Sequence, residues 1–241
     1  MNLIKDFNIQ KNDVITITGG GGKTSLMFAL GKELSEMGMI HVLTTTAKIC
    51  VSDVPENQCM ISKYIKEVIN QIKKDPKREW VIGKEIIKGQ KISGFSNEEL
   101  EYLQDSLGSL VILNEGDGSK RKPYKFYSDY EPMIPKLTTK IIHVIGAEVL
   151  FKKIDDAFFH RSELYGDTEA VFDEGVFKEV LENFIKNKLD AKLEKTIPRI
   201  LFINKADGEH LKNAEIMGKI GKLLFDQCFI GSLKEGWVKR Y

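Results

Sequence analysis

Short apolar runs alternate with amphipathic stretches along the first part of the chain. Val14 to Thr18 is a β-branched run that stops at four consecutive glycines, and apolar residues recur at helical spacing from Ser25 to Met37. A second β-branched run extends from His41 to Thr46. This order predicts a strand, a loop, a helix and a second strand, which together form a βαβ unit of a parallel sheet.

The rest of the chain predicts further elements of the same kind. Ser96 and Glu99 have the spacing of a capping box, which indicates a helix to about Leu107. Strands are also predicted for Glu79–Lys84, Leu110–Leu113, Ile141–Ile145 and Arg199–Ile203, and helices for Tyr64–Lys74 and Glu174–Lys186. We therefore expect one α/β domain over residues 1–241, with a mostly parallel central sheet flanked by helices.

Two segments fit this pattern less well. Residues 51–95 are predicted as an insertion or a peripheral part, because their order of elements gives no clear topology. Residues 120–136 are basic and aromatic and contain three prolines. We expect this second segment to lie on the surface and to cover a site as a lid.

The glycines and the residues after them have the composition of a phosphate-binding loop. Such a loop needs backbone N–H groups that converge on the oxygens, a positive point charge and a helix N-terminus. The predicted nucleotide-binding residues here are Gly19, Gly20, Gly21, Gly22, Lys23, Thr24 and Ser25. The Thr24 hydroxyl is also a candidate ligand for Mg²⁺. The alternative is a glycine-rich turn that only joins a strand to a helix.

The loop departs from the strict GxxxxGK[ST] spacing, because Ile17 stands where that pattern has glycine. It fits the xGGxGK[ST] variant and so resembles the signal-recognition, MinD and BioD class of phosphate-loop NTPases. Thr18 replaces a lysine that is frequent in this class, which disfavours a dimer-dependent ATPase of the MinD kind. The resemblance implies the three-layer phosphate-loop NTPase fold, with the nucleotide at the carboxyl ends of the strands.

The tetrapeptide Asn204-Lys205-Ala206-Asp207 follows a predicted strand and indicates which base is bound. Guanine presents N1–H and an amine side by side, so one carboxylate accepts both hydrogen bonds, whereas adenine has an acceptor at the first position. By similarity to the [NT]KxD motif of GTPases, Asp207 is the candidate carboxylate, Asn204 approaches the other edge of the base, and Lys205 lies against the ring. The motif favours GTP over ATP. A polar turn with Asp207 near a helix cap is the alternative.

Acidic and hydroxyl residues end two other predicted strands. In Glu115-Gly116-Asp117-Gly118, a carboxylate is expected to reach Mg²⁺ or its waters, and the Gly118 N–H is expected to reach the terminal phosphate. We predict Glu115 and Thr45 as metal ligands with Thr24, and Asp117 as a catalytic residue with Lys23. The alternatives are an acidic turn for the first motif and plain β propensity for Thr44, Thr45 and Thr46.

Basic residues near the acidic motif are further candidates. Arg121 is predicted to stabilise charge that develops on the phosphates, or with Lys122 to bind an anionic substrate. A solvated basic turn explains these two residues equally well, and the same holds for His160 and Arg161. The four histidines and three cysteines are scattered, without the spacing of a metal or redox site.

The composition of the chain mainly excludes certain partners and membrane-targeting segments. The net charge is +1, and no Lys- or Arg-rich stripe indicates nucleic acid or a membrane surface as a partner. The N-terminal twenty residues have only short apolar stretches broken by charge, which is unlike a signal peptide or a membrane span. We expect a cytoplasmic protein with reduced thiols.

Several short motifs occur in one order along most of the chain: TGGGGKTSLMFALGKEL, LTTTAKI, NEGDGSKRKP, HRSE and NKAD. In this order they resemble the YqeC-like family, described as accessory proteins of selenium-dependent hydroxylases. Gly118, Ser119, Thr44, Thr46, His160 and Arg161 are further residues that match this family. Gly116 stands where the family usually has alanine, which loosens the backbone but keeps both carboxylates.

Three functions fit these features. The motifs predict an Mg²⁺-dependent GTPase. The family resemblance implies that it helps to mature a selenium-dependent molybdenum hydroxylase, with that client metalloenzyme or its cofactor-loading machinery as partner. The alternative is an ATP-dependent small-molecule kinase or ligase resembling dethiobiotin synthetase, in which Lys120 to Lys125 bind an anionic acceptor. A third possibility is a binding module that carries a cofactor without nucleotide turnover.

Overall fold

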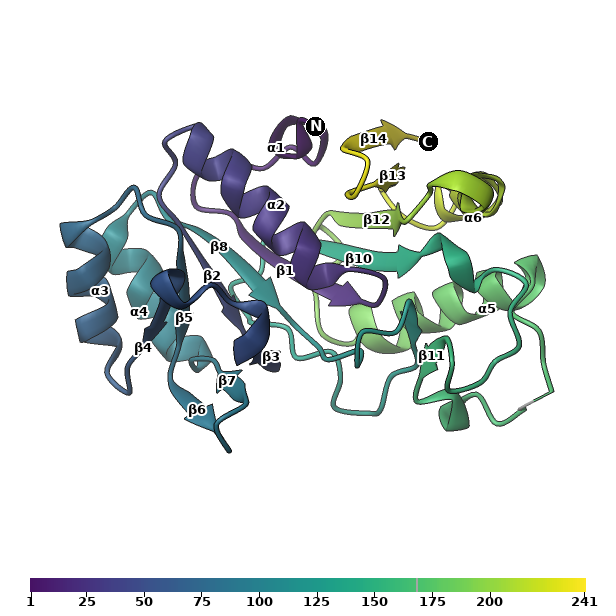
Figure 1. Ribbon diagram of the computed structural model, residues 1–241, viewed down its shortest axis with the longest axis horizontal. Coiled ribbons are helices and arrows are strands. Elements are labelled where there is room, and N and C mark those ends of the chain that lie inside the picture. The colour runs from purple at the N-terminus through teal and green to yellow at the C-terminus, as the bar shows by residue number, and fades with distance from the viewer. Residues whose placement is uncertain (168) are drawn as a thin grey trace.

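A computed structural model describes residues 1–167 and 169–241. Within them, nine strands form one sheet in the order β14-β13-β12-β10-β1-β8-β2-β5-β4 (Figure 1). Neighbouring strands are parallel except for β13 and β14. The strands are β1 Val14–Gly19, β2 His41–Thr45, β4 Cys59–Ile61, β5 Trp80–Gly83, β8 Val111–Glu115, β10 Lys140–Gly146, β12 Arg199–Asn204, β13 Gln227–Ser232 and β14 Trp237–Arg240.

Side chains along each strand alternate between the two faces of this sheet, so both faces carry buried residues. Helices cover both faces. Ile15 and Ile17 of β1 pack in the same core as α1 and α2, whereas Val14 packs with α3 and α4. On the latter face, α5 and α6 cover β10, β12 and β13. The helices are α1 Leu3–Asp6, α2 Lys23–Glu36, α3 Ile65–Lys74, α4 Asn97–Leu107, α5 Glu174–Phe184 and α6 Leu211–Gly221. The predicted three-layer α/β architecture with a mostly parallel sheet is confirmed.

Local signals in the sequence predict several elements well. The capping box is present, since the Ser96 hydroxyl accepts from the Glu99 N–H and the Glu99 carboxylate accepts from the Ser96 N–H. The strands predicted at residues 14–18 and 199–203 are present in the structure, and each is one residue longer than predicted. The sequence did not predict α1, α6, β13 or β14, which complete one edge of the sheet and cover it.

Residues 51–95 contribute to the fold in two ways. Their strands β4 and β5, together with α3, extend the main sheet and cover its edge. The other two strands of this segment, β6 at Glu85–Ile87 and β7 at Lys91–Ser93, join β3, which lies just before the segment at Lys48–Cys50, in a separate three-stranded antiparallel sheet with the order β3-β7-β6. We call these three strands the small sheet.

The prediction that residues 120–136 form a surface segment is wrong for its centre. Tyr124 and Lys125 form β9 and pair in parallel with β11, which is Phe159–His160. Tyr124 and Lys125 are only 2% and 1% exposed. The Tyr124 ring packs 4.9 Å from that of Phe172, and a buried ion pair satisfies Lys125, so apolar packing holds this basic segment inside. The predicted role of Lys120–Lys125 as one anion-binding segment is therefore wrong for Lys125.

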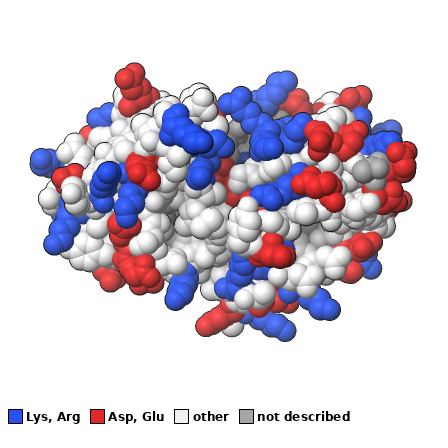
Figure 2. Space-filling model, turned by 90° about the horizontal axis from the view of Figure 1, so that it is seen from below, with Lys and Arg blue, Asp and Glu red and all other residues white. Residues whose placement is uncertain are grey.

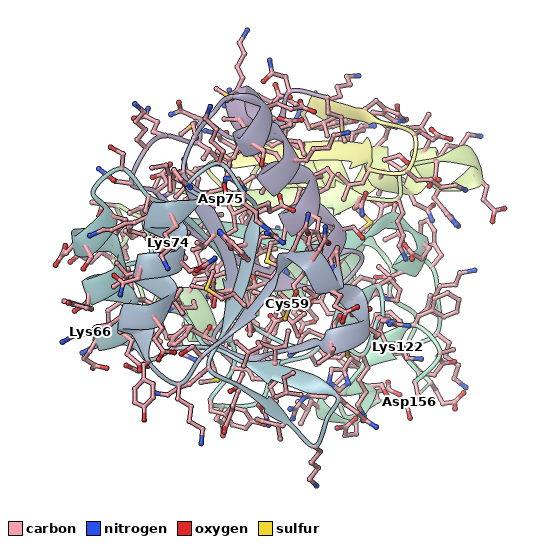
Figure 3. The ribbon with its side chains drawn as sticks, turned by 60° about the vertical axis from the view of Figure 1, so that its left-hand side comes forward. Cys59, Lys66, Lys74, Asp75, Lys122 and Asp156 are labelled. Carbon is pink, nitrogen blue, oxygen red and sulfur yellow. The ribbon has the colours of Figure 1, made fainter. Side chains whose placement is uncertain are left out.

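Charges of both signs are mixed on the face that Figure 2 shows, without a stripe of one sign. Figure 3 places Lys66 and Lys74 on α3, on the side of the molecule opposite Lys122 and Asp156. Within residues 1–167 and 169–241, no helix has both the length and the apolar character needed to cross a membrane.

Candidate functional site

The glycine loop, Gly19–Gly22, joins the end of β1 to the start of α2. Gly19, Gly21 and Gly22 have φ angles of +100°, +68° and +118°, which L side chains rarely adopt. A Cβ atom on Gly21 would also lie 2.2 Å from the backbone nitrogen of Gly146. The four glycines therefore permit both the backbone conformation and the close approach of the neighbouring chain.

Backbone hydrogen bonds hold the glycine loop in place. Three of them are Gly19 N–H to Asp117 Oδ2 at 2.9 Å, Gly20 N–H to Val144 O at 2.9 Å and Gly21 N–H to Lys122 O at 3.0 Å. The N–H groups of Lys23, Thr24 and Ser25 lie in the first turn of α2, where no intrahelical acceptor exists. The donors that remain for an anion are therefore those of the helix N-terminus, together with the ammonium group of Lys23.

Two carboxylates from the end of β8 lie beside the glycine loop, because Glu115 pairs in register with Ile17 of β1. Lys23 Nζ is 3.0 Å from Asp117 Oδ1 and 3.9 Å from Glu115 Oε1, and it donates to Gly19 O at 2.7 Å. The Thr24 hydroxyl donates to Glu115 Oε2 at 2.9 Å. The structure thus brings together the predicted residues Lys23, Thr24, Glu115 and Asp117.

The pKa values of the two carboxylates shift in opposite directions. Burial raises the pKa of Glu115, and Lys23 counteracts this only in part. Burial also opposes ionisation of Asp117, but Lys23 and further favourable contacts outweigh it and lower its pKa. Asp117 also accepts from the Tyr127 hydroxyl at 3.0 Å. Asp117 is therefore the carboxylate that carries the charge opposite Lys23.

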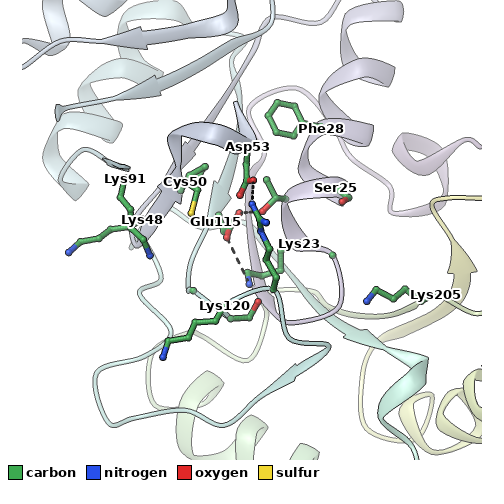
Figure 4. Close-up of a pocket in the computed structure, with 16 residues that line it drawn as sticks. Lys23, Ser25, Phe28, Lys48, Cys50, Asp53, Lys91, Glu115, Lys120 and Lys205 are labelled. Carbon is green, nitrogen blue, oxygen red and sulfur yellow. Dashed lines mark hydrogen bonds and ion pairs between the residues drawn. The ribbon is translucent and has the colours of Figure 1, made fainter. Parts of the chain in front are cut away.

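A cavity of about 430 Å³ opens above these residues, and a second of about 620 Å³ lies beside it. Both volumes are within the range of small-molecule sites, roughly 300–1,000 Å³. Gly22, Ser25 and Lys205 line both cavities, so the two are adjacent. We call the first the inner cavity, shown in Figure 4, and the other the outer cavity.

The residues predicted to bind the base line the outer cavity. Asn204 is the last residue of β12, Lys205 and Asp207 follow it, and all three line this cavity. Asn204 Nδ2 donates to Gly21 O at 2.8 Å, which ties this motif directly to the glycine loop. Lys205 forms an ion pair with Glu148 and has a φ of +60°. The structure thus brings two motifs that are far apart in the sequence to one site.

The three threonines at the end of β2 and directly after it, Thr44, Thr45 and Thr46, point elsewhere. The Thr44 hydroxyl donates to Ile82 O at 3.1 Å, and the Thr45 hydroxyl donates to Glu115 O at 2.8 Å. The Thr46 hydroxyl contacts Met133 O. None of the three lines the inner or the outer cavity. Their hydroxyls tie β2 to neighbouring backbone, and the side chain of Thr45 contacts Glu115 only through its carbonyl oxygen.

Sequence reasoning missed Asp53. It lies in a short 3₁₀ turn, Val51–Asp53, directly after β3, and lines the inner cavity. Its carboxylate accepts from Arg121 at 2.7 Å, so an ion pair spans the cavity between the small sheet and the loop after β8. Gly118 and Ser119 of that loop also line the cavity. No motif marks Asp53, because its position follows from the topology of residues 51–95.

The family-matched residues His160 and Arg161 lie outside both cavities. Arg161 Nε is 3.3 Å from Glu131 Oε2, and Glu131 Oε1 is 3.0 Å from Lys125 Nζ. Lys125 in turn donates to Gly118 O at 2.8 Å. These ion pairs connect Arg161 to the loop after β8. Desolvation lowers the pKa of His160 to about 4, so its ring is neutral near pH 7.

The fold and the site define an α/β protein with a glycine loop between the central strand of its sheet and the following helix. The family described as "YqeC protein" matches residues 15–163, which is more than half of the chain. A protein of Escherichia coli (strain K12), described as "Uncharacterized protein YqeC", is 30% identical over 169 residues. The match covers 68% of this chain and 64% of that relative, which is less than two thirds of the relative's length. The chain belongs to the YqeC family.

Proposed function

We propose that this chain is an Mg²⁺-dependent GTPase that acts as a maturation factor for a selenium-dependent molybdenum hydroxylase. The main support is the 2.8 Å hydrogen bond from Asn204 Nδ2 to Gly21 O, which joins the base motif to the glycine loop. A nucleotide then lies with its phosphates in the inner cavity and its base in the outer one. In this arrangement Asp207 accepts from N1–H and the exocyclic amine of guanine.

The side chains around the inner cavity fit a magnesium triphosphate. Mg²⁺ is bound in proteins through one or two oxygen ligands together with phosphate oxygens and water. The Thr24 hydroxyl and the Glu115 carboxylate supply such oxygens, 2.9 Å apart. The metal neutralises phosphate charge, Lys23 and the N-terminus of α2 bind phosphate oxygens, and Arg121 is the candidate for charge that develops during hydrolysis.

Calorimetric titration with Mg²⁺ and GTP, GDP, ATP or ADP tests the nucleotide assignment. We expect guanine nucleotides to bind more tightly than adenine nucleotides, and Asp207→Asn to shift preference toward xanthosine nucleotides. The matched control is Glu209→Gln, which removes a charge two residues away on an 88% exposed side chain. Equal or tighter binding of ATP would overturn the GTPase assignment and favour a small-molecule kinase or ligase.

The maturation role rests on family membership and needs a separate test. The hydroxylase activity of cells that lack the gene is measured after complementation with wild type, Asp207→Asn or Glu209→Gln. We expect wild type and Glu209→Gln to restore activity, and Asp207→Asn to restore little. Full activity in uncomplemented cells contradicts the maturation role, and full rescue by Asp207→Asn contradicts the need for guanine binding.

A further inference from the structure

The small sheet turns one polar face toward the inner cavity. Residues along a strand alternate between the faces of a sheet, so Lys48 and Cys50 share one face and Ile49 lies on the other. Cys50 is directly opposite Lys91 of β7, and Ile49 is opposite Ile92. Ile49 and Ile92 are buried, and Lys48, Cys50 and Lys91 line the cavity together with Ile49. The burial of the two isoleucines therefore fixes the orientation of the face that carries Lys48, Cys50 and Lys91.

The inner cavity concentrates positive charge. Its acidic residues are Asp53 and Glu115, and its basic residues are Lys23, Lys48, Lys91, Lys120, Arg121 and Lys205. The whole chain has a net charge of only +1. A cavity lined by one predominant sign of charge raises the local concentration of ligands with the opposite sign.

Three of the cationic groups already have acidic partners. Lys23 pairs with Asp117, Arg121 with Asp53, and Lys205 with Glu148. Among the residues that the structure describes, the other three, Lys48, Lys91 and Lys120, have no ion pair with a carboxylate. Their charges are available to a ligand.

These three lysines lie away from the base motif. Figure 4 shows Lys48 and Lys91 on one side of Glu115, and Lys205 on the opposite side of Lys23. Lys120 lies below Glu115 in the same view. With the base in the outer cavity, a nucleotide extends past Lys205 and Lys23, and its terminal phosphate is the part nearest to Lys48 and Lys91.

We propose that Lys48, Lys91 and Lys120 form a second anion site, next to the terminal phosphate, which binds an oxyanionic co-substrate such as a phosphate monoester or a carboxylate. This inference rests on the proposed function, because the direction of the nucleotide follows from the base assignment. It makes the small sheet the part of the chain that selects the second ligand. The neighbouring Cys50 gives the site a chemical reporter.

Guanosine 5′-tetraphosphate is the probe, since its fourth phosphate extends beyond the position of the terminal phosphate of GTP. Its affinity with Mg²⁺ is compared with those of GTP and GDP in wild type and in Lys48→Ala/Lys91→Ala. The matched control is Lys66→Ala/Lys74→Ala, which removes two exposed charges from α3 (Figure 3) that do not line the inner cavity. Both lysines of the test variant are exposed, so the substitutions leave the core intact.

We expect wild type and control to bind the tetraphosphate about tenfold more tightly than GTP, equal to about 1.4 kcal/mol. Lys48→Ala/Lys91→Ala should lose this gain and keep its affinities for GTP and GDP. Alkylation of Cys50 should be slowed more by the tetraphosphate than by GTP, with Cys59 as the internal reference. Mass spectrometry measures both thiols.

Two results would overturn the second site while leaving the GTPase intact. In one, wild type binds GTP but gains nothing from the fourth phosphate. In the other, the double variant loses affinity for GTP relative to GDP, so these lysines contact the terminal phosphate itself. Absence of guanine-nucleotide binding in wild type overturns the proposed function and, with it, this site.

Discussion

Replacement of Asp117 by asparagine tests whether this carboxylate supports the buried charge of Lys23. Asp117 and Lys23 are 1% and 3% exposed, and their charged atoms are 3.0 Å apart. Asp117 Oδ2 also accepts from Gly19 N–H and the Tyr127 hydroxyl. Asparagine retains one oxygen for those two donors, but its NH₂ group then faces the Lys23 ammonium group, donor against donor.

The expected loss of stability arises because the charge of Lys23 stays buried without its partner. Removal of one partner of a buried ion pair costs about 3–5 kcal/mol, because the other charge stays buried without compensation. Glu115 compensates poorly, since its carboxylate is 3.9 Å away and burial raises its pKa. At about 2–4 °C per kcal/mol for a domain of this size, Asp117→Asn should lower Tm by roughly 6–20 °C.

Urea unfolding of wild type and three variants isolates this interaction. Asp105→Asn is the control, because Asp105 is exposed on α4, and it should change the free energy of unfolding by less than about 0.5 kcal/mol. In Lys23→Met/Asp117→Asn the unpaired charge is gone, so the double variant should recover part of the loss. A loss below about 1 kcal/mol for Asp117→Asn, or no recovery in the double variant, would refute the reasoning.

The pH dependence of the unfolding free energy provides a second test of the same ion pair. The pKa of Asp117 is lowered in the folded protein, so the carboxylate stabilises the fold above its unfolded pKa of about 3.9. This contribution disappears as the pH falls through the folded value. The difference in unfolding free energy between wild type and Asp117→Asn should therefore be largest at pH 7 and should decrease as the pH falls below the unfolded pKa of about 3.9. A constant difference contradicts the ion-pair explanation.

Three further predictions concern single positions. Burial raises the pKa of Glu115, so ionisation of this carboxyl destabilises the folded protein more as the pH rises above the unfolded pKa of about 4.3. Glu115→Gln should therefore stabilise the ligand-free protein more at pH 8 than at pH 5. The same substitution should weaken Mg²⁺-dependent GTP binding. Urea unfolding at both pH values checks the sign, and an equal effect at both contradicts it. Gly21→Ala should lower Tm more than Gly118→Ala does, because its Cβ meets the backbone of Gly146, whereas no atom lies within 4 Å of a Cβ at Gly118. Ser96→Ala should cost about 1 kcal/mol in urea unfolding by removing the cap of α4, and no change would mean that this bond contributes nothing to stability.

The sequence predicted those elements whose signals are local. The β-branched run at Val14–Thr18, the glycines and the amphipathic helix after them follow from short-range periodicity, and the structure confirms them. The capping box is equally local, since Ser96 and Glu99 satisfy each other's backbone N–H groups within one turn. Such signals do not depend on the rest of the chain.

Residues 51–95 and 120–136 resisted prediction because their structure depends on distant contacts. The strands of the small sheet are three residues long, too short for periodicity to fix their pairing. The basic segment around Lys125 has the composition of a surface loop. It is buried because Glu131 neutralises its charge and aromatic rings from later in the chain pack against Tyr124.

The sequence by itself determined the chemistry at the strand ends: the glycine loop, the two carboxylates after β8 and the motif after β12. Tertiary structure alone decided which of these groups meet. Asn204 reaches Gly21 across 183 positions of the chain, and Glu115 reaches Thr24 across 91, because parallel strands bring their carboxyl ends to one edge of the sheet. Asp53, Lys48 and Lys91 join the same cavity through strand pairing and burial of the opposite face, which no local pattern encodes.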